Sequence, residues 1–192
     1  MSSKTRYTVI GAGHGGKAMA ADLAVRGFTV KLYNRTAEHI SEIVLRGEID
    51  LEYENGISRL GRLAGATSDI AEALDGADVI MIVVPASGHR DIARSCVSHL
   101  RDGQILVLNP GRTGGALEFR RILDLEGCAA DVIVAETGTF VFASRSTGPA
   151  QARIFRHKNA VPLAALPATR TGHVLEAVCE AYPQFVPAHS VL

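Results

Sequence analysis

The residues best placed to do chemistry lie near the N-terminus, in the run Gly11-Ala12-Gly13-His14-Gly15-Gly16. This run has the spacing G-x-G-x-x-G; an apolar strand-like stretch, residues 7–10, precedes it, and an alanine-rich helical stretch, residues 17–26, follows. In that setting the first glycine permits a tight turn, the second lets a pyrophosphate approach the backbone, and the third allows close helix-to-strand packing. Because the unpaired amides of the helix start would face the phosphates, the run predicts a dinucleotide-binding turn.

The neighbouring segments decide how much weight this motif carries. Glycine occupies 19 of the 192 positions, so the spacing can arise by chance. Gly27 lies where the helix should stop, and residues 28–33 alternate apolar and polar side chains like a second strand. This order of elements favours dinucleotide binding over a glycine-rich turn without a ligand.

The end of the second predicted strand indicates which dinucleotide. It reads Tyr33-Asn34-Arg35-Thr36, with no carboxylate before Glu38. An acidic residue about 20 positions past the motif binds the ribose hydroxyls of NAD(H), whereas an arginine accommodates a 2′-phosphate. Arg35 offers a planar charged fork, and Asn34 and Thr36 can donate hydrogen bonds, so we expect NADP(H) in preference to NAD(H). The alternative is that Thr36 caps the next helix and Arg35 is a solvated surface charge.

The composition limits the classes of molecule that the chain is expected to bind. Twenty basic residues balance 20 acidic ones, which leaves no electrostatic footprint for nucleic acid or an anionic membrane surface. The N-terminus lacks the apolar stretch of a signal peptide, and the longest apolar run, residues 79–86, is too short to span a bilayer. We therefore expect a cytoplasmic protein whose partners are small molecules.

The three cysteines are Cys96, Cys128 and Cys179. They are isolated and odd in number, with no C-x-x-C pair and no histidine at metal-ligand spacing. They are typical of small buried apolar residues, so we predict neither a disulfide nor a metal site.

Apolar runs alternate with helical periodicity along most of the chain, which predicts an α/β fold with a Rossmann-type doubly wound parallel sheet. Asp69 to Glu72 has the spacing of a capping box. A loop or short hairpin is expected between about residue 49 and Gly65. Further strands are expected over residues 79–84, 104–108 and 131–135, and helices over residues 37–46, 69–76, 88–100 and 115–126.

The pattern changes after about residue 139, where short extended runs occur near residues 140–143, 152–155 and 161–164 and are followed by one helical stretch, 169–181. We expect residues 139–192 to form a small mixed or antiparallel extension of the same sheet. The whole chain, residues 1–192, is then one dinucleotide-binding domain.

Two loops at the carboxyl ends of predicted strands should face the ligand, because that is where such sheets bind ligands. Val84 and Pro85 follow one strand, and the proline fixes a turn near the nicotinamide half of the cofactor. Asn109 and Gly111 open the other loop, which continues to Gly115 at the start of a helix. The amides there can bind an anion such as a substrate carboxylate. The loop lacks the Gly-Lys-Ser/Thr ending of a P-loop, so triphosphate hydrolysis is not indicated.

Three motifs together resemble the N-terminal NAD(P)-binding domain of the opine (octopine/nopaline) dehydrogenase family. They are the glycine turn, Val83-Val84-Pro85-Ala86, and most specifically Asn109-Pro110-Gly111-Arg112-Thr113-Gly114-Gly115-Ala116-Leu117-Glu118-Phe119. The resemblance covers essentially the whole chain. It implies an oxidoreductase acting on CH–NH bonds, which condenses a 2-oxo acid with an amino acid and reduces the imine with hydride from the cofactor.

The resemblance also implies a helical C-terminal domain that supplies the catalytic histidine and its acidic partner. The sequence stops at Leu192, about where that domain would begin, so we expect a cofactor platform that is inactive alone. No catalytic residue is assigned within it. His14 is expected near the pyrophosphate and His189 near the domain junction. His89 either lies toward the nicotinamide side, after the Pro85 loop, or begins a surface helix. Glu136 and Thr137 either line the cleft or belong to a capped turn.

Two other functions remain open. A dehydrogenase of the glycerol-3-phosphate or ketopantoate-reductase type would share the glycine turn and the Val-Pro loop, but we would not expect the loop of residues 109–119 in this form. A stand-alone NADP(H)-binding sensor or regulatory module is the third possibility, because a fold alone does not specify a function.

Overall fold

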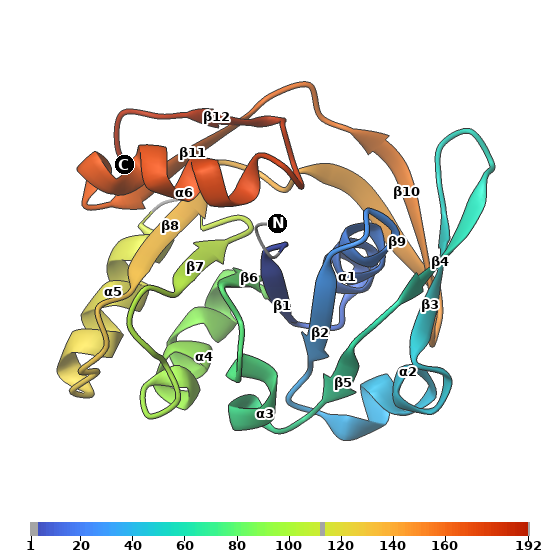
Figure 1. Ribbon diagram of the computed structural model, residues 1–192, viewed down its shortest axis with the longest axis horizontal. Helices are drawn as coiled ribbons and strands as arrows, with labels where there is room; N and C mark the ends of the chain where they lie inside the picture. Colours follow the sequence, from blue (N-terminus) through green and yellow to red (C-terminus); the bar gives the residue numbers. More distant parts are fainter. Residues whose placement is uncertain (1–3, 112–113, 192) are drawn as a thin grey trace.

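A mostly parallel eight-stranded sheet forms the centre of the molecule (Figure 1). The computed structural model describes residues 4–111 and 114–191. Along the sheet the strands follow the order β12-β11-β8-β7-β6-β1-β2-β5, and β11 runs antiparallel to β8 while all other neighbours are parallel. The predicted doubly wound fold is confirmed. The strands are β1 Arg6–Ile10, β2 Thr29–Tyr33, β5 Gly65–Thr67, β6 Val79–Ile82, β7 Ile105–Leu108, β8 Ile133–Thr137, β11 Val161–Leu166 and β12 Phe185–Pro187.

Alternate residues of the central strands enter two different cores. Val9 packs in a cluster with α1 (His14–Val25) and α6 (Thr171–Val178), on one face of the sheet. Ile10 packs in the other cluster, with α3 (Ile70–Leu74), α4 (His89–Cys96) and α5 (Gly115–Leu125). Because both faces are covered by helices, the central strands β6 and β7 are apolar throughout, as expected for a parallel sheet.

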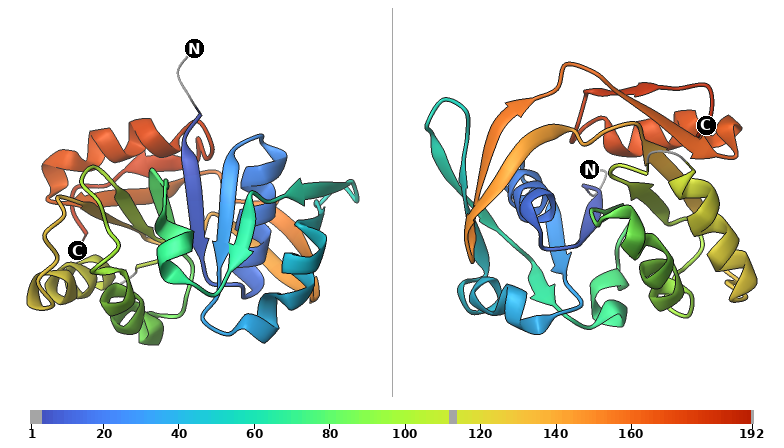
Figure 2. Two further views of the ribbon diagram at one scale, coloured as in Figure 1. Left: turned by 60° about the horizontal axis from the view of Figure 1, so that its bottom comes forward. Right: turned by 180° about the vertical axis from the view of Figure 1, so that it is seen from behind.

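A second, four-stranded sheet packs on the side of α1 that faces away from the main sheet. Its strands follow the order β4-β3-β10-β9, and Figure 2 shows α1 between the two sheets. This arrangement explains why every residue of α1 from Gly16 to Leu23 is buried, since a helix enclosed on both sides needs no polar face. The strands are β3 Glu48–Glu52, β4 Ser58–Arg62, β9 Phe142–Gly148 and β10 Gln151–His157.

The second sheet corrects one expectation. The sequence predicted a loop or hairpin near residues 49–65, and an extension of the main sheet for all the strands after residue 139. The hairpin exists, but its strand β3 pairs in parallel with β10, about a hundred residues further along the chain. Only β11 and β12 extend the main sheet. Local periodicity predicts strands but carries no signal for pairing between segments so distant in sequence.

Several α-helices are shorter than predicted. Residues 37–46 form a 3₁₀ turn, η1 (Ala37–Ile40), followed by α2 (Ser41–Arg46). The short turns η2 (Ala86–Gly88) and η3 (Ala168–Arg170) precede α4 and α6. Asp69 caps α3 as predicted, and its carboxylate accepts the amides of Ala71 and Glu72 at 2.8 and 3.4 Å. Among the helices of the described residues, none has the length and apolarity to cross a membrane.

A buried carboxylate joins α1 to the second sheet. The Asp22 side chain has no exposed surface; it accepts hydrogen bonds from Tyr53 Oη at 2.7 Å and from Arg26 Nε at 2.9 Å. His157 Nε2, on β10, lies 3.7 Å from Asp22 Oδ2. Burial alone would raise the pKa of Asp22, but interactions with His157, Arg26 and Tyr53 outweigh it and hold this pKa below its ordinary value. Asp22 therefore fixes the position of the helix that begins at the glycine turn.

A candidate dinucleotide-binding cleft

Gly11 and Gly16 close the turn between β1 and α1. Gly11 has φ +109°, in the left-handed region that favours glycine, and a β-carbon there would overlap the carbonyl oxygen of Val83. A β-carbon on Gly16 would overlap the Gly11 carbonyl oxygen. Both glycines are therefore required by the packing of the turn itself, as the motif predicts.

Gly13, by contrast, faces open space. It is the N-cap residue of α1, and no described atom lies within 4 Å of where its β-carbon would be. A glycine has no side chain to cap the helix, so the first amides of α1 stay available to an anion. The open position and the available amides fit the pyrophosphate of a dinucleotide.

The other motif residues shape this cradle. The Ala12 amide donates to Asn34 Oδ1 at 3.1 Å. His14 is the first residue of α1, and its Nδ1 accepts the Ser146 amide of β9 at 3.0 Å. At Gly15 a β-carbon would be only 3.0 Å from a ring carbon of Phe140. The second sheet thus borders the turn and holds the His14 ring.

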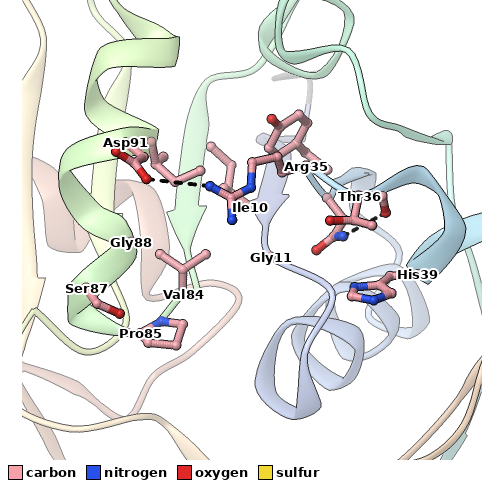
Figure 3. A pocket seen from close by; sticks show the side chains of 13 residues that line it. Ile10, Gly11, Arg35, Thr36, His39, Val84, Pro85, Ser87, Gly88 and Asp91 are labelled. Atoms are coloured by element: carbon pink, nitrogen blue, oxygen red, sulfur yellow. Dashed lines mark hydrogen bonds and ion pairs between the residues drawn. The ribbon is translucent and has the colours of Figure 1, made fainter.

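A cavity of about 350 Å³ adjoins the turn, at the carboxyl ends of β1, β2 and β6 (Figure 3). The strand order reverses at β1, and such switch points are where doubly wound sheets bind ligands. Of the predicted residues the cavity gathers Gly11, Asn34, Arg35, Thr36, Val84 and Pro85. The sequence reasoning did not assign the other lining residues, which are Ile10, Tyr33, His39, Ser87, Gly88, Asp91 and Ile92.

Asn34 makes two hydrogen bonds within the protein. Its Oδ1 accepts the Ala12 amide, and its Nδ2 donates to the Thr36 carbonyl at 2.9 Å. An amide nitrogen carries two N–H groups, so the second N–H of Asn34 leaves the predicted donation to a phosphate open. Asn34 also links the glycine turn to the loop after β2.

Thr36 and Arg35 keep their side chains accessible to a ligand. Thr36 occupies the N-cap position of η1, but its hydroxyl makes no capping hydrogen bond within the described residues. The Arg35 side chain is 76 % exposed, and its Nη1 lies 3.5 Å from Asp91 Oδ2. Figure 3 shows this contact spanning the cavity.

The loop after β7 lies deeper than predicted. Asn109 is buried and its Nδ2 donates to the Val107 carbonyl at 2.8 Å, while the Gly111 amide donates to the Thr137 carbonyl at 3.3 Å. Neither Asn109 nor Gly111 lines the cavity. A β-carbon on Gly111 would overlap the carboxylate of Glu136, so glycine is required there by packing. Arg112 and Thr113 of the same motif lie outside the described residues.

Glu136 occupies the start of α5, where a substrate carboxylate was expected. Its Oε2 accepts the Ala116 amide at 2.7 Å, and its side chain is buried. Burial raises the pKa of Glu136, and the hydrogen bond from Ala116 partly opposes that rise. Thr137, also buried, donates to the Leu108 carbonyl at 3.2 Å. Both residues belong to β8 rather than to a turn, and neither lines the cavity.

His89 corrects another expectation. It begins α4 as predicted, but the residue is only 1 % exposed rather than on the surface. Neither ring nitrogen has a hydrogen-bond partner among the described residues, and Nδ1 lies 3.3 Å from where a β-carbon on Gly115 would be. Burial lowers the pKa of His89, although the negative charge of Glu118 opposes this shift. A buried, neutral imidazole outside the cavity is poorly placed for proton transfer there.

Comparison with protein families agrees with this geometry. Residues 6–110 match the family described as NAD-dependent glycerol-3-phosphate dehydrogenase N-terminus. An opine dehydrogenase from Arthrobacter sp. (strain 1C) is 43 % identical over all 192 residues. Those residues are 53 % of that protein, so the chain spans about half the length of this curated relative.

Solved structures show the same fold. Octopine dehydrogenase with NADH and L-arginine superposes with a TM-score of 0.84 and 22 % identity, over 97 % of this chain and 49 % of that one. Yersinopine dehydrogenase with NADP⁺ superposes with a TM-score of 0.77 and 16 % identity, over 99 % of this chain and 49 % of that one. One fold therefore serves either nicotinamide dinucleotide.

Proposed function

Because the chain belongs to the family of NAD-dependent glycerol-3-phosphate dehydrogenase N-terminal domains, and resembles opine dehydrogenases over its whole length, we propose that it is the NADP(H)-binding domain of an opine-dehydrogenase-like oxidoreductase. The observation that carries this proposal is the proximity of two features. Gly11, the first residue of the glycine turn, lines the cavity that contains Arg35, and the open position at Gly13 follows two residues later in the same turn. This arrangement supports a site in which the turn binds the pyrophosphate and Arg35 binds a further phosphate.

In this proposal the turn of Gly11, Ala12, Gly13, His14, Gly15 and Gly16 holds the pyrophosphate through backbone amides. Arg35 and the Thr36 hydroxyl bind the 2′-phosphate, and Asn34 positions the loop that carries them. Val84 and Pro85 form the opposite wall, while Asn109 and Gly111 shape the layer beneath the site. The preference for NADP(H) rests on Arg35, because a guanidinium matches phosphate in both charge and geometry.

Replacement of Arg35 by alanine tests the choice of cofactor. We expect Arg35→Ala to weaken NADPH binding about tenfold to a hundredfold, the usual effect of losing a hydrogen bond to a charged group. NADH affinity should change less than about twofold, because NADH has no 2′-phosphate. Isothermal titration calorimetry with both cofactors measures the ratio of the NADPH and NADH dissociation constants.

Arg59→Ala is the matched control for this experiment, since it removes an arginine of β4 that does not line the cavity. It should leave both affinities unchanged. Equal affinity of the wild-type chain for NADPH and NADH, or the same ratio in Arg35→Ala, would contradict the assignment.

The bound cofactor supplies hydride, and the resemblance implies that the acceptor is the imine of a 2-oxo acid and an amino acid. The residues of this chain hold and orient the cofactor. Glu136 is engaged by the Ala116 amide and His89 is buried outside the cavity, so neither is free to transfer a proton in the cleft. We propose that the acid and base belong to a helical domain that corresponds to the other half of the relatives.

It follows that the 192-residue chain alone should have negligible turnover. NADPH absorbance, followed with mixtures of 2-oxo acids and amino acids, should stay constant although NADPH binds. Rapid oxidation would show that the catalytic groups lie within this chain. Small-molecule partners make the cytoplasm the proposed compartment.

A dehydrogenase of the glycerol-3-phosphate type is the second candidate, because the matching family carries that description. That match ends at residue 110, before most of the loop of residues 109–119, whereas the opine dehydrogenase relative matches the whole chain. This difference favours the first candidate. A regulatory module would also bind NADPH. Adding such a module to the protein that it regulates would not produce CH–NH reductase activity.

A further inference from the structure

The contact between Arg35 and Asp91 crosses the cavity proposed to bind the adenosine half of the cofactor. Arg35 comes from the loop after β2, and Asp91 from the first turn of α4 on the opposite wall. Their closest charged atoms are 3.5 Å apart, and their side chains are 76 % and 60 % exposed. Figure 3 shows the guanidinium turned toward Asp91, over the space between Ile10 and Val84.

Asp91 is distinct from the other acidic residues near it. Among the residues that line the cavity, it carries the one carboxylate. Two acidic residues of α5 and its C-cap pair with arginines of α4 outside the cavity. Glu118 lies 3.0 Å from Arg90, and Glu126 lies 2.9 Å from Arg94. Besides Arg35 and Asp91, the ionisable residues that line the cavity are His39 and Tyr33. His39 lies on the same side of the cavity as Arg35. Among the lining residues, Asp91 therefore carries the one charge that opposes a phosphate held by Arg35.

The guanidinium carries a single positive charge, and two anions compete for it when a 2′-phosphate arrives. A phosphate that binds the guanidinium must displace Asp91 from it, and the attraction between Arg35 and Asp91 is then lost. NADH brings no such phosphate, so Arg35 can stay paired with Asp91 across the adenosine. The ion pair thus opposes one cofactor and leaves the other unaffected.

We propose that Asp91 is a specificity-determining residue that reduces the preference for NADP(H) created by Arg35. This inference rests on the proposed function, because it assumes that the cavity binds the adenosine half of the cofactor. If Asp91 acts in this way, the wild-type chain prefers NADP(H) only moderately, and replacing Asp91 increases that preference.

Two small probes test the inference without catalysis. 2′,5′-ADP consists of adenosine with a 5′-phosphate and a 2′-phosphate, whereas 5′-AMP lacks the 2′-phosphate. In Asp91→Asn we expect 2′,5′-ADP to bind about three- to fivefold more tightly, the range of one exposed charge interaction. Binding of 5′-AMP should change less than about twofold, and the gain should shrink at high salt because exposed charges are screened. Calorimetry at two salt concentrations provides both comparisons.

Glu126→Gln is the matched control, since it removes one negative charge that pairs with α4 outside the cavity. It should not change the affinity ratio of the two probes. In the double variant Arg35→Ala/Asp91→Asn the gain should disappear, because Asp91 acts through Arg35. A gain that persists in the double variant, an unchanged ratio in Asp91→Asn, or an equal change for both probes would overturn the inference.

The single variant Arg35→Ala separates this inference from the proposed function. If it abolishes the preference for 2′,5′-ADP while Asp91→Asn has no effect, the role of Asp91 is wrong and the NADP(H) assignment stands. If Arg35→Ala leaves the preference unchanged, both are wrong.

Discussion

Replacing Gly16 by alanine will destabilise the domain by at least about 3 kcal/mol, the upper range of overpacking in a well-packed interior. The added β-carbon would overlap the Gly11 carbonyl oxygen, which is backbone rather than a movable side chain. Gly11 itself cannot shift easily, because its amide donates to the Tyr33 carbonyl at 2.8 Å. Urea unfolding followed by circular dichroism measures the loss, and an unfolded variant is the extreme form of the same result.

Gly13→Ala is the matched control for this experiment. It adds the same methyl group to the same motif, but within the described residues nothing lies within 4 Å of the new atom. The variant should keep its stability within about 1 kcal/mol, the effect of a Gly-to-Ala change at a compatible position. It should nevertheless lose cofactor affinity, because the methyl group occupies the place of the pyrophosphate. If Gly16→Ala were as stable as Gly13→Ala, the packing account of the turn would be wrong.

Asp22→Ala should destabilise the domain by about 2 to 4 kcal/mol, somewhat less than the usual cost of breaking a fully buried ion pair. The reduction allows for Arg26, whose side chain is 32 % exposed and can reach water. The Tyr53 hydroxyl would lose its acceptor, and α1 would lose one of its polar contacts with the second sheet and the residue that follows β3. Urea unfolding measures this change as well.

The same carboxylate makes stability depend on pH. Because the pKa of Asp22 is lower in the folded chain than its ordinary value, its contribution is complete above the ordinary aspartate range. The contribution disappears as the pH falls through the lower, folded-state pKa. The wild-type chain should therefore lose stability more steeply in acid than Asp22→Ala does.

Asp124→Ala is the control for Asp22→Ala. Asp124 also pairs with an arginine four residues away, at 2.6 Å, but its side chain is 56 % exposed. An exposed pair of this kind contributes less than about 1 kcal/mol, so the variant should resemble the wild type. Equal losses from Asp22→Ala and Asp124→Ala would mean that burial of the first pair adds nothing.

The local features of the site could be predicted from the sequence. The glycine turn depends on contacts between residues a few positions apart, such as Gly11 and Gly16, and the cap at Asp69 is equally local. Features that depend on distant pairing could not. No local pattern signals that β3 lies beside β10, and the enclosure of α1 follows from that pairing.

Several site residues were missed for the same reason. Asp91 lies on the polar side of α4, and it reaches the cavity because α4 begins soon after the carboxyl end of β6. Glu136 reads as a cleft residue at a strand end, yet it turns inward to the amide of Ala116. The motif at residues 109–111 signalled this indirectly, because Gly111 leaves the space that the Glu136 carboxylate fills.

A crystal structure of the chain with bound NADPH tests the central claim most directly. The account predicts the pyrophosphate on the amides at the start of α1, against Gly13, and the 2′-phosphate within hydrogen-bond distance of the Arg35 guanidinium. Adenosine bound elsewhere, or a 2′-phosphate in solvent while Arg35 stays on Asp91, would contradict it.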